Sequence, residues 1–335
     1  MAPPRGLPRL ALTMGDPAGV GPEVIARALE DAAVFQECRP VVIGDARAME
    51  QAITQVGGRL AVQVVADVTD TGRQAGEVDV LQVPGLSLGQ VAPGQLSAQA
   101  GLAAVTWVRT GAELALRGEL DGLVTGPVNK EAVTLAGVPF TGHTELLAEM
   151  ATSRVAMLLA TERLRVVHVS THLSLRQACE RVRRDRILET IRIADEGCRR
   201  LGIATPRLAV AGLNPHAGEH GLFGDEDESE IAPAVAAARI AGIDASGPWP
   251  PDTVFHEAVE GRYDCVVAMY HDQGHIAIKM TDFYGGVNVT LGLPFVRTSV
   301  DHGTGFAIAG KGIANAKSMR LAISMAARMA HAAAG

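Results

Sequence analysis

Short apolar segments of strand length alternate with helical patterns along most of the chain. The segments lie at residues 10–14, 39–44, 60–65, 78–83, 122–125, 165–172, 208–213 and 265–269. The longest helical pattern covers residues 97–117, where Leu102, Val105 and Val108 begin a series of apolar positions at three- and four-residue spacing. Strands that alternate with helices are typical of a doubly wound α/β fold. We therefore expect ligands to bind beyond the carboxyl ends of the strands.

The composition narrows the class of protein. The chain has 335 residues, of which 47% are hydrophobic, so it can bury a large core and is expected to form two lobes. Its net charge is -7, with basic and acidic residues interspersed, which argues against a nucleic acid partner. No apolar segment approaches the roughly 20 residues that span a bilayer. Four cysteines without CxxC spacing, and a first segment without an apolar leader, favour a reduced, cytoplasmic location.

Three histidines mark the ends of apolar segments. His172, His216 and His271 each stand at, or within three residues of, the carboxyl end of a predicted strand. Such ends meet at one edge of a sheet, and neutral imidazoles are common ligands of zinc-like ions. Three protein ligands leave a position open for water or substrate. For each histidine alone, a hydrogen-bonded loop residue is the alternative.

The residues after His271 bring further polar groups. They include His275, Lys279, Asn288 and Arg297. Two cations near a metal indicate an anionic substrate, because arginine grips carboxylate or phosphate in a bidentate fork and lysine acts as a point charge or as an acid or base. Each cation could instead lie on the surface. His275 either lines the site or supports it from a second layer.

Other segments have simpler interpretations. Gly15–Glu23 is a glycine-rich turn into a helix that begins near Pro22, but it lacks the GxGxxG dinucleotide fingerprint, so a ligand loop and a tight structural turn both remain open. His168 lies inside a predicted strand and is expected to be a core residue. The acidic residues 225–230 are expected at the start of a helix. No role is assigned to His220, His256 and His331.

Six motifs occur in order along the chain: GDPAGVGPE, TGHTE, THLSLR, NPHAGE, YHDQGH and GLPFVRTSVDHGT. Together they resemble the 4-hydroxythreonine-4-phosphate dehydrogenase (PdxA) family. The glycine-rich ends also resemble the wider isocitrate and isopropylmalate dehydrogenase fold. The resemblance implies two α/β/α domains with the active site in the interdomain cleft, and a homodimer with shared active sites. We expect residues 1–130 and 285–335 to form the first domain, with the NAD loop, and residues 131–284 to form the second, with the metal ligands and dimer contacts.

The resemblance also implies a chemistry. NAD or NADP would oxidise the 3-hydroxyl of a small phosphorylated hydroxy acid, with β-decarboxylation following, and a divalent metal (Zn, Mg, Mn or Co) would assist. Matched position by position, the metal ligands are His172, His216 and His271, and the acid/base pair is Lys279 with Asp272. The implied substrate contacts are His143, Thr144, Asp252, Asn288 and Arg297, and the implied cofactor contacts are His302, Gly303, Thr304, Gly305 and Asn315.

The substrate has two main alternatives. The first is 4-hydroxythreonine-4-phosphate, the substrate of pyridoxine biosynthesis, but His275 stands in a segment that is more apolar in those enzymes. A histidine there resembles the branch that acts on 4-phospho-D-threonate or 4-phospho-D-erythronate. Retention of Thr141–Thr144 and Arg297 favours either over a cyclic dihydrodiol. A three-histidine metal hydrolase is the alternative from another class, and the loop at residues 301–315 argues against it; a metal-dependent binding protein is the third.

Overall fold

The structure is a computed structural model that describes residues 6–334, apart from residues 70, 72–73, 87 and 90. The chain divides into two compact units, one of Met1–Ser153 with Leu293–Gly335 and one of Arg154–Gly292. The boundaries expected at residues 130 and 285 differ from these, because each boundary segment packs on the other unit's core. Helix α6 (His143–Ala151) packs on α4 (Ala98–Leu116) of the first unit. Strand β11 (Val287–Leu291) pairs with β6 (Ala156–Ala160) of the second.

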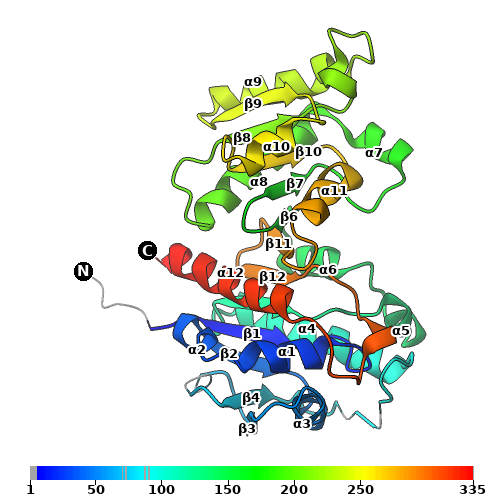
Figure 1. The fold of residues 1–335 in the computed structure, drawn as a ribbon, viewed down its shortest axis with the longest axis vertical. Helices are drawn as coiled ribbons and strands as arrows, with labels where there is room; N and C mark the ends of the chain where they lie inside the picture. Colours follow the sequence, from blue (N-terminus) through cyan, green and yellow to red (C-terminus); the bar gives the residue numbers. More distant parts are fainter. Residues whose placement is uncertain (1–5, 70, 72–73, 87, 90, 335) are drawn as a thin grey trace. The chain divides into compact units, whose positions relative to one another are not determined.

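The first unit is built on a parallel sheet. Its strand order is β3-β4-β2-β1-β5-β12 (Figure 1). The strands are β1 (Arg9–Thr13), β2 (Arg39–Ile43), β3 (Ala61–Val65), β4 (Glu77–Leu81), β5 (Gly122–Thr125) and β12 (Val296–Val300). The central strands β1, β5 and β12 are almost entirely buried. Their near-continuous apolar sequences reflect that burial on both faces.

Helices pack on this sheet. Besides α4 and α6 they are α1 (Gly21–Leu29), α2 (Val34–Glu37), α3 (Ala46–Gln55), α5 (Lys130–Leu135) and α12 (Lys317–Ala334), with a short 3₁₀ turn at Phe306–Ile308. Helix α4 packs on β1, β2 and β5, whereas α12 packs on β12, β5 and β1. Ser97 caps α4 by accepting the N–H of Ala100. At Gly111 a Cβ would lie 2.6 Å from Leu123 Cδ1, so glycine lets the helix approach the sheet closely.

The second unit has a mixed sheet. Its order is β11-β6-β7-β10-β8-β9, with antiparallel pairs among the first three strands and parallel pairs among the last four. The remaining strands are β7 (Arg165–His168), β8 (Leu208–Ala211), β9 (Ala245–Trp249) and β10 (Cys265–Ala268). The segment from Gly247 was expected to be a loop, and this was wrong for its first residues. Strand β9 is the last in the order, and an edge strand tolerates Pro248.

The helices of the second unit complete its core. They are α7 (Leu175–Arg181), α8 (Arg184–Arg200), α9 (Ala232–Ile240), α10 (Val254–Val259) and α11 (His271–Thr281), with short turns at Pro215–Gly218 and Asp227–Ile231. Leu159, Val166, Val266 and Ile278 are buried together and join three strands to α11. Fully burying each such side chain stabilises the fold by about 1.5–3 kcal/mol. The acidic run does begin a helical segment, as expected.

Two predicted strands end earlier than expected. Strand β7 stops at His168 rather than at His172, because the chain turns where the Ser170 hydroxyl donates to the Met269 carbonyl (2.9 Å). Strand β8 stops at Ala211, since the N–H groups of Leu213 and the next residue donate to the buried carboxylate of Asp227. The expected histidine ligands therefore stand on turns beyond the sheet.

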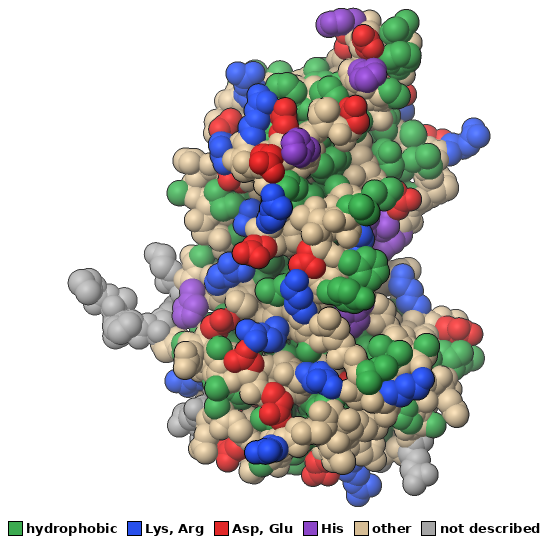
Figure 2. Space-filling view, viewed as in Figure 1, with side chains coloured by type: hydrophobic (Ala, Val, Ile, Leu, Met, Phe, Trp, Pro, Cys, Tyr) green, Lys and Arg blue, Asp and Glu red, His purple; other side chains and the backbone are tan. Residues whose placement is uncertain are grey.

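Two surface observations bear on partners. In the described part of the chain, no helix is both long and apolar enough to cross a membrane. Figure 2 shows basic and acidic side chains interspersed over the face in view, in keeping with the even charge pattern of the sequence. The leader-free segment noted in the sequence includes residues 1–5, which lie outside the described residues.

Candidate active site

Four histidines gather beyond the carboxyl ends of β7 and β10. These strands are parallel neighbours with Ala268 opposite His168, so their ends coincide. The ring centroids of His172 and His271 are 5.7 Å apart, and His275 stacks on His271 at 3.5 Å with an interplanar angle of 14°. The structure thus brings together two of the three expected metal ligands, with His275 beside them.

Asp272 holds His271 by its inner nitrogen. The Nδ1–H of His271 donates to the Asp272 carboxylate over 2.6 Å, and this tautomer leaves Nε2 with a lone pair. A carboxylate that orients a ligand imidazole in this way is a common partner in metal sites. His275 is fixed similarly, since its Nδ1–H donates to the carbonyl of His271 (3.0 Å). Imidazoles prepared in this way fit a divalent cation in donor chemistry.

His168 is the histidine that the sequence interpretation left out. It is 1% exposed, its Nδ1–H donates to the Met157 carbonyl (3.4 Å), and its Nε2 makes no hydrogen bond to the described residues. Burial, followed by the charges of His275, His271 and His172, lowers the pKa of His168 to about 3, so the ring is neutral. Its position one helical turn before His172 in sequence was a signal that could have linked it to the cluster.

His216 stands apart in its contacts. It lies in the turn after β8 with a left-handed backbone (φ 53°), and its ring packs near Phe223, with centroids 6.3 Å apart. Asp227, fully buried, holds the preceding residues: its carboxylate accepts the N–H groups of Leu213 and Asn214 and the side-chain amide of Asn214. Across the described residues, no group of three His, Cys, Asp or Glu side chains is arranged as a complete metal site.

A second cluster, in the first unit, is cationic. Arg297 on β12 is 2% exposed and donates to the Thr125 hydroxyl (2.7 Å). Burial lowers the pKa of Arg297 to about 9, with the charge of Glu145 opposing the shift, so the guanidinium remains charged at neutral pH. For the neighbouring His143, burial and then the charges of Arg297 and Lys130 hold the pKa well below its usual value.

This cationic cluster is suited to an anion. The Nε2 atom of His143 is buried and makes no hydrogen bond to the described residues. His143 and Thr144 open α6, whose N-cap, Gly142, offers no side-chain hydrogen bond to the first turn. Amide groups at a helix start, next to a buried guanidinium, favour negative charge. Lys130, the first residue of α5, was not among the expected site residues, although the polar loop after β5 in the sequence pointed to this region.

The other expected substrate contacts lie in the second unit. Lys279 continues the line of His271 and His275 at one residue per turn of α11, with its ammonium 5.4 Å from the centre of the Phe283 ring. Asn288 on β11 has a buried Oδ1 that makes no hydrogen bond to the described residues. Asp252 is exposed just before α10. A line of two imidazoles and an ammonium on one helix face can serve both metal binding and proton transfer.

The expected cofactor contacts lie on residues 302–315, called here the cofactor loop. The N–H of Val20 donates to the carbonyl of Thr304 (2.8 Å), so the loop is joined to the turn after β1. The ring of His302 bonds only to the adjacent Gly303 carbonyl among the interactions found. Asn315 accepts the N–H of Lys317, which is a helix-start role that explains this residue without a cofactor.

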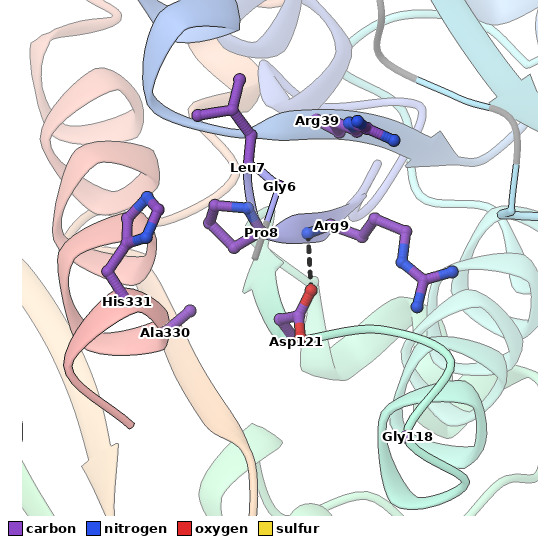
Figure 3. Close-up of a pocket in the computed structure, with 9 residues that line it drawn as sticks. All are labelled: Gly6, Leu7, Pro8, Arg9, Arg39, Gly118, Asp121, Ala330 and His331. Atoms are coloured by element: carbon purple, nitrogen blue, oxygen red, sulfur yellow. Dashed lines mark hydrogen bonds between the residues drawn. The ribbon is translucent and has the colours of Figure 1, made fainter. Parts of the chain in front are cut away.

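A cavity of about 440 Å³ lies elsewhere in the first unit. Figure 3 shows it at the amino end of β1, lined by Arg9, Arg39, Asp121 and His331 among others. None of the expected site residues lines it. Because ligands of parallel α/β sheets bind at the carboxyl ends of the strands, this cavity is not the candidate active site.

Comparison with known proteins gives concordant matches. The family model described as pyridoxal phosphate biosynthetic protein PdxA matches residues 36–326. A 4-hydroxythreonine-4-phosphate dehydrogenase of Beijerinckia indica is 48% identical, covering 96% of this chain and 94% of the relative. A D-threonate 4-phosphate dehydrogenase of Bordetella bronchiseptica is also 48% identical, covering 98% and 94%. The crystal structure of 4-hydroxythreonine-4-phosphate dehydrogenase from Klebsiella pneumoniae superposes with a TM-score of 0.87 at 46% identity, covering 96% and 99%. The expected α/β fold is confirmed.

Proposed function

The chain belongs to the PdxA family of NAD(P)-dependent dehydrogenases, and from that premise we propose that it oxidises the 3-hydroxyl of a small phosphorylated hydroxy acid, with β-decarboxylation following. The proposed substrate is 4-hydroxythreonine-4-phosphate, with 4-phospho-D-threonate or 4-phospho-D-erythronate as the alternative. The observation that carries the proposal is the buried Arg297 beside His143, because a charge buried without an adjacent carboxylate contact favours an anionic ligand. The family also favours a dehydrogenase over a three-histidine hydrolase.

His172, His216 and His271 are the proposed ligands of a divalent metal. When bound, such an ion supplies Lewis acidity toward the hydroxyl and toward the charge that develops during decarboxylation. Asp272 is proposed to orient His271 through the 2.6 Å contact. That task leaves Lys279, on the same face of α11, as the preferred acid/base for the substrate proton.

Metal content tests the ligand set. We expect His216→Ala to lose stoichiometric metal while keeping the fold, measured by elemental analysis of the purified protein and by circular dichroism. His220→Ala is the matched control, because His220 is exposed in the same turn region and its contact is a weak one to Glu228 (3.8 Å). Full metal retention in His216→Ala would remove His216 from the ligand set.

A homodimer is also proposed. Four apolar side chains on and after α11 are strongly exposed: Ile276, Met280, Phe283 and Tyr284 are all above 60%. A contiguous exposed apolar segment of this kind is typical of an interface. Light scattering should give twice the chain mass, and Met280→Asp should weaken the dimer. Ile240→Asp, on α9, is the control, because Ile240 is equally exposed and lies on a different helix.

A substrate panel tests the proposed substrates. NADH formation in the presence of a divalent metal would be compared by kcat/KM for 4-phosphohydroxythreonine, phosphothreonate, phosphoerythronate and a dihydrodiol. We expect one of the phosphorylated acids to exceed the dihydrodiol by at least about tenfold, a factor that a single buried cation–anion contact can supply. Preference for the dihydrodiol would contradict the proposal.

A further inference from the structure

The turn that follows β1 supports the cofactor loop. The N–H of Val20 donates to the carbonyl of Thr304, and a Cβ on Gly19 would lie only 2.6 Å from that oxygen. A Cβ on Gly21 would lie 2.2 Å from the carbonyl of Met14. Glycine is therefore required in this turn by close approaches of its own chain. Of the two readings that the sequence left open, the structural turn accounts for these glycines.

Two side chains of α1 fasten the far part of the cofactor loop. The carboxylate of Glu23 accepts the N–H of Gly310 over 2.6 Å, and the guanidinium of Arg27 donates to the carbonyl of Gly312. The two residues are four apart on the helix and so lie on one face. Glu23 is 1% exposed, and its second oxygen makes no hydrogen bond to the described residues. A buried carboxylate is thus committed to one backbone N–H of the loop.

The backbone of the loop has little freedom around these contacts. Gly310 and Gly312 both have left-handed conformations, with φ of 79° and 61°. A Cβ on Gly312 would lie 2.0 Å from the carbonyl of Gln55, and a Cβ on Gly310 would lie 2.8 Å from Pro93. The loop is therefore held between α1, the end of α3 and Pro93, and Glu23 is its buried polar contact with α1.

We propose that Glu23 is a positioning residue for the dinucleotide: its carboxylate fixes Gly310 and thereby sets the affinity of the cofactor loop for NAD(P) without touching the cofactor. The role rests on the proposed function only in that residues 302–315 hold the cofactor. Without the carboxylate, the Gly310 N–H loses its acceptor and the loop samples conformations in which the dinucleotide contacts are not formed. Each such conformation lowers the competent fraction and raises the apparent dissociation constant by the same factor.

The test compares two glutamates of the same helix region. Glu23→Ala is expected to raise the Kd for the reduced cofactor and the KM for the oxidised cofactor about tenfold, as when a buried N–H loses its partner, with kcat changed less than about twofold. Glu30→Ala is the matched control, because Glu30 also accepts a backbone N–H, that of Arg59 at 2.7 Å, but outside the cofactor loop. Glu23→Gln keeps an oxygen acceptor and should restore most of the affinity.

The direct measurement is fluorescence titration with NADH or NADPH, whichever binds the wild type more tightly. It needs no substrate, so an incorrect substrate proposal leaves the result interpretable. If Glu23→Ala fails to fold, Arg27→Ala takes its place, since Arg27 is exposed and its loss should raise Kd about threefold through the same loop. Unchanged cofactor affinity in the folded variant, or an equal loss in Glu30→Ala, would overturn the inference.

Discussion

Arg297 is a full positive charge in the interior of the first unit. Its partner among the contacts found is neutral, the hydroxyl of Thr125, although burial of an ion carries a large desolvation cost. The charge of Glu145 contributes to its environment but does not prevent the fall in pKa to about 9. A protein keeps such a group when an anionic ligand compensates it, which is the basis of the proposed substrate class.

The first prediction concerns this guanidinium. We expect Arg297→Lys to raise the KM for the phosphorylated substrate about 10- to 100-fold, because lysine keeps the charge but loses the planar fork. The KM for NAD should change much less. Steady-state kinetics with each substrate varied in turn gives both values. Arg117→Lys, an exposed arginine paired with Glu119, is the control; an unchanged substrate KM in Arg297→Lys would remove Arg297 from the substrate site.

Asp16 provides a prediction about pH. Burial raises the pKa of Asp16 from 3.8 to about 6, opposed by the hydrogen bond from the N–H of Ala18. The folded state therefore binds this proton more tightly than the unfolded state, so the stabilisation is complete below pH 3.8 and is lost as pH rises through 6. The shift corresponds to at most about 3 kcal/mol.

Asp16→Asn should remove that dependence. Asn keeps the oxygen that accepts the Ala18 N–H but has no charge to bury, so the variant should be more stable than wild type at pH 8 and similar at pH 4. Urea unfolding at the two pH values gives the free energies. Asp67→Asn is the control, since hydrogen bonds from Thr69 lower the pKa of that exposed carboxyl. A wild-type slope in Asp16→Asn between pH 4 and 8 would contradict the assignment.

Helix α11 is the element on which the second unit's candidate site depends. It begins at His271 and presents His275 and Lys279 on the following turns, while Ile278 anchors it in the core. The helix lies close to β7 at Gly274, where a Cβ would be 2.4 Å from His168 Nε2 and 2.6 Å from Val166 Cγ1. The glycine of the YHDQGH motif therefore sets the distance between the histidine-bearing helix and the sheet.

The third prediction tests this contact. Alanine normally stabilises a helix relative to glycine by about 1 kcal/mol, but Gly274→Ala should destabilise the protein by about 1–3 kcal/mol through overpacking. In a His168→Ala background, the same substitution should cost much less, because the ring is no longer there. Urea unfolding of the four proteins in this cycle measures the coupling. Equal costs in both backgrounds would show that the ring of His168 does not determine the spacing.

Sequence patterns predicted the elements better than their ends. The helix predicted over residues 97–117 is α4, because its apolar spacing and its Ser97 cap are local signals. Strand β9 was missed because Gly247 and Pro248 suggest a loop, and only the edge position beside β8 permits a strand there. The pairing of His168 with Gly274 could not be predicted, since it depends on register between β7 and α11 and not on any spacing along the chain.

At the scale of the whole molecule, the family assignment and the chemistry come from different kinds of evidence. Two relatives with different substrates are equally similar to the chain, at 48% identity, so overall similarity does not choose between them. Local chemistry must do so, and His275 stacked on His271 is the residue most directly placed to influence it. The proposed enzyme would couple an alcohol oxidation to loss of carbon dioxide, with a divalent metal needed for both.

The stoichiometry of the reaction tests this account most directly. With the preferred phosphorylated hydroxy acid, NAD or NADP and a divalent metal, NADH or NADPH and carbon dioxide should form in a 1:1 ratio, and EDTA should abolish both. The two products can be followed together by absorbance and by trapping of labelled carbon dioxide. Turnover without NAD(P), or full activity after complete removal of the metal, would contradict the account.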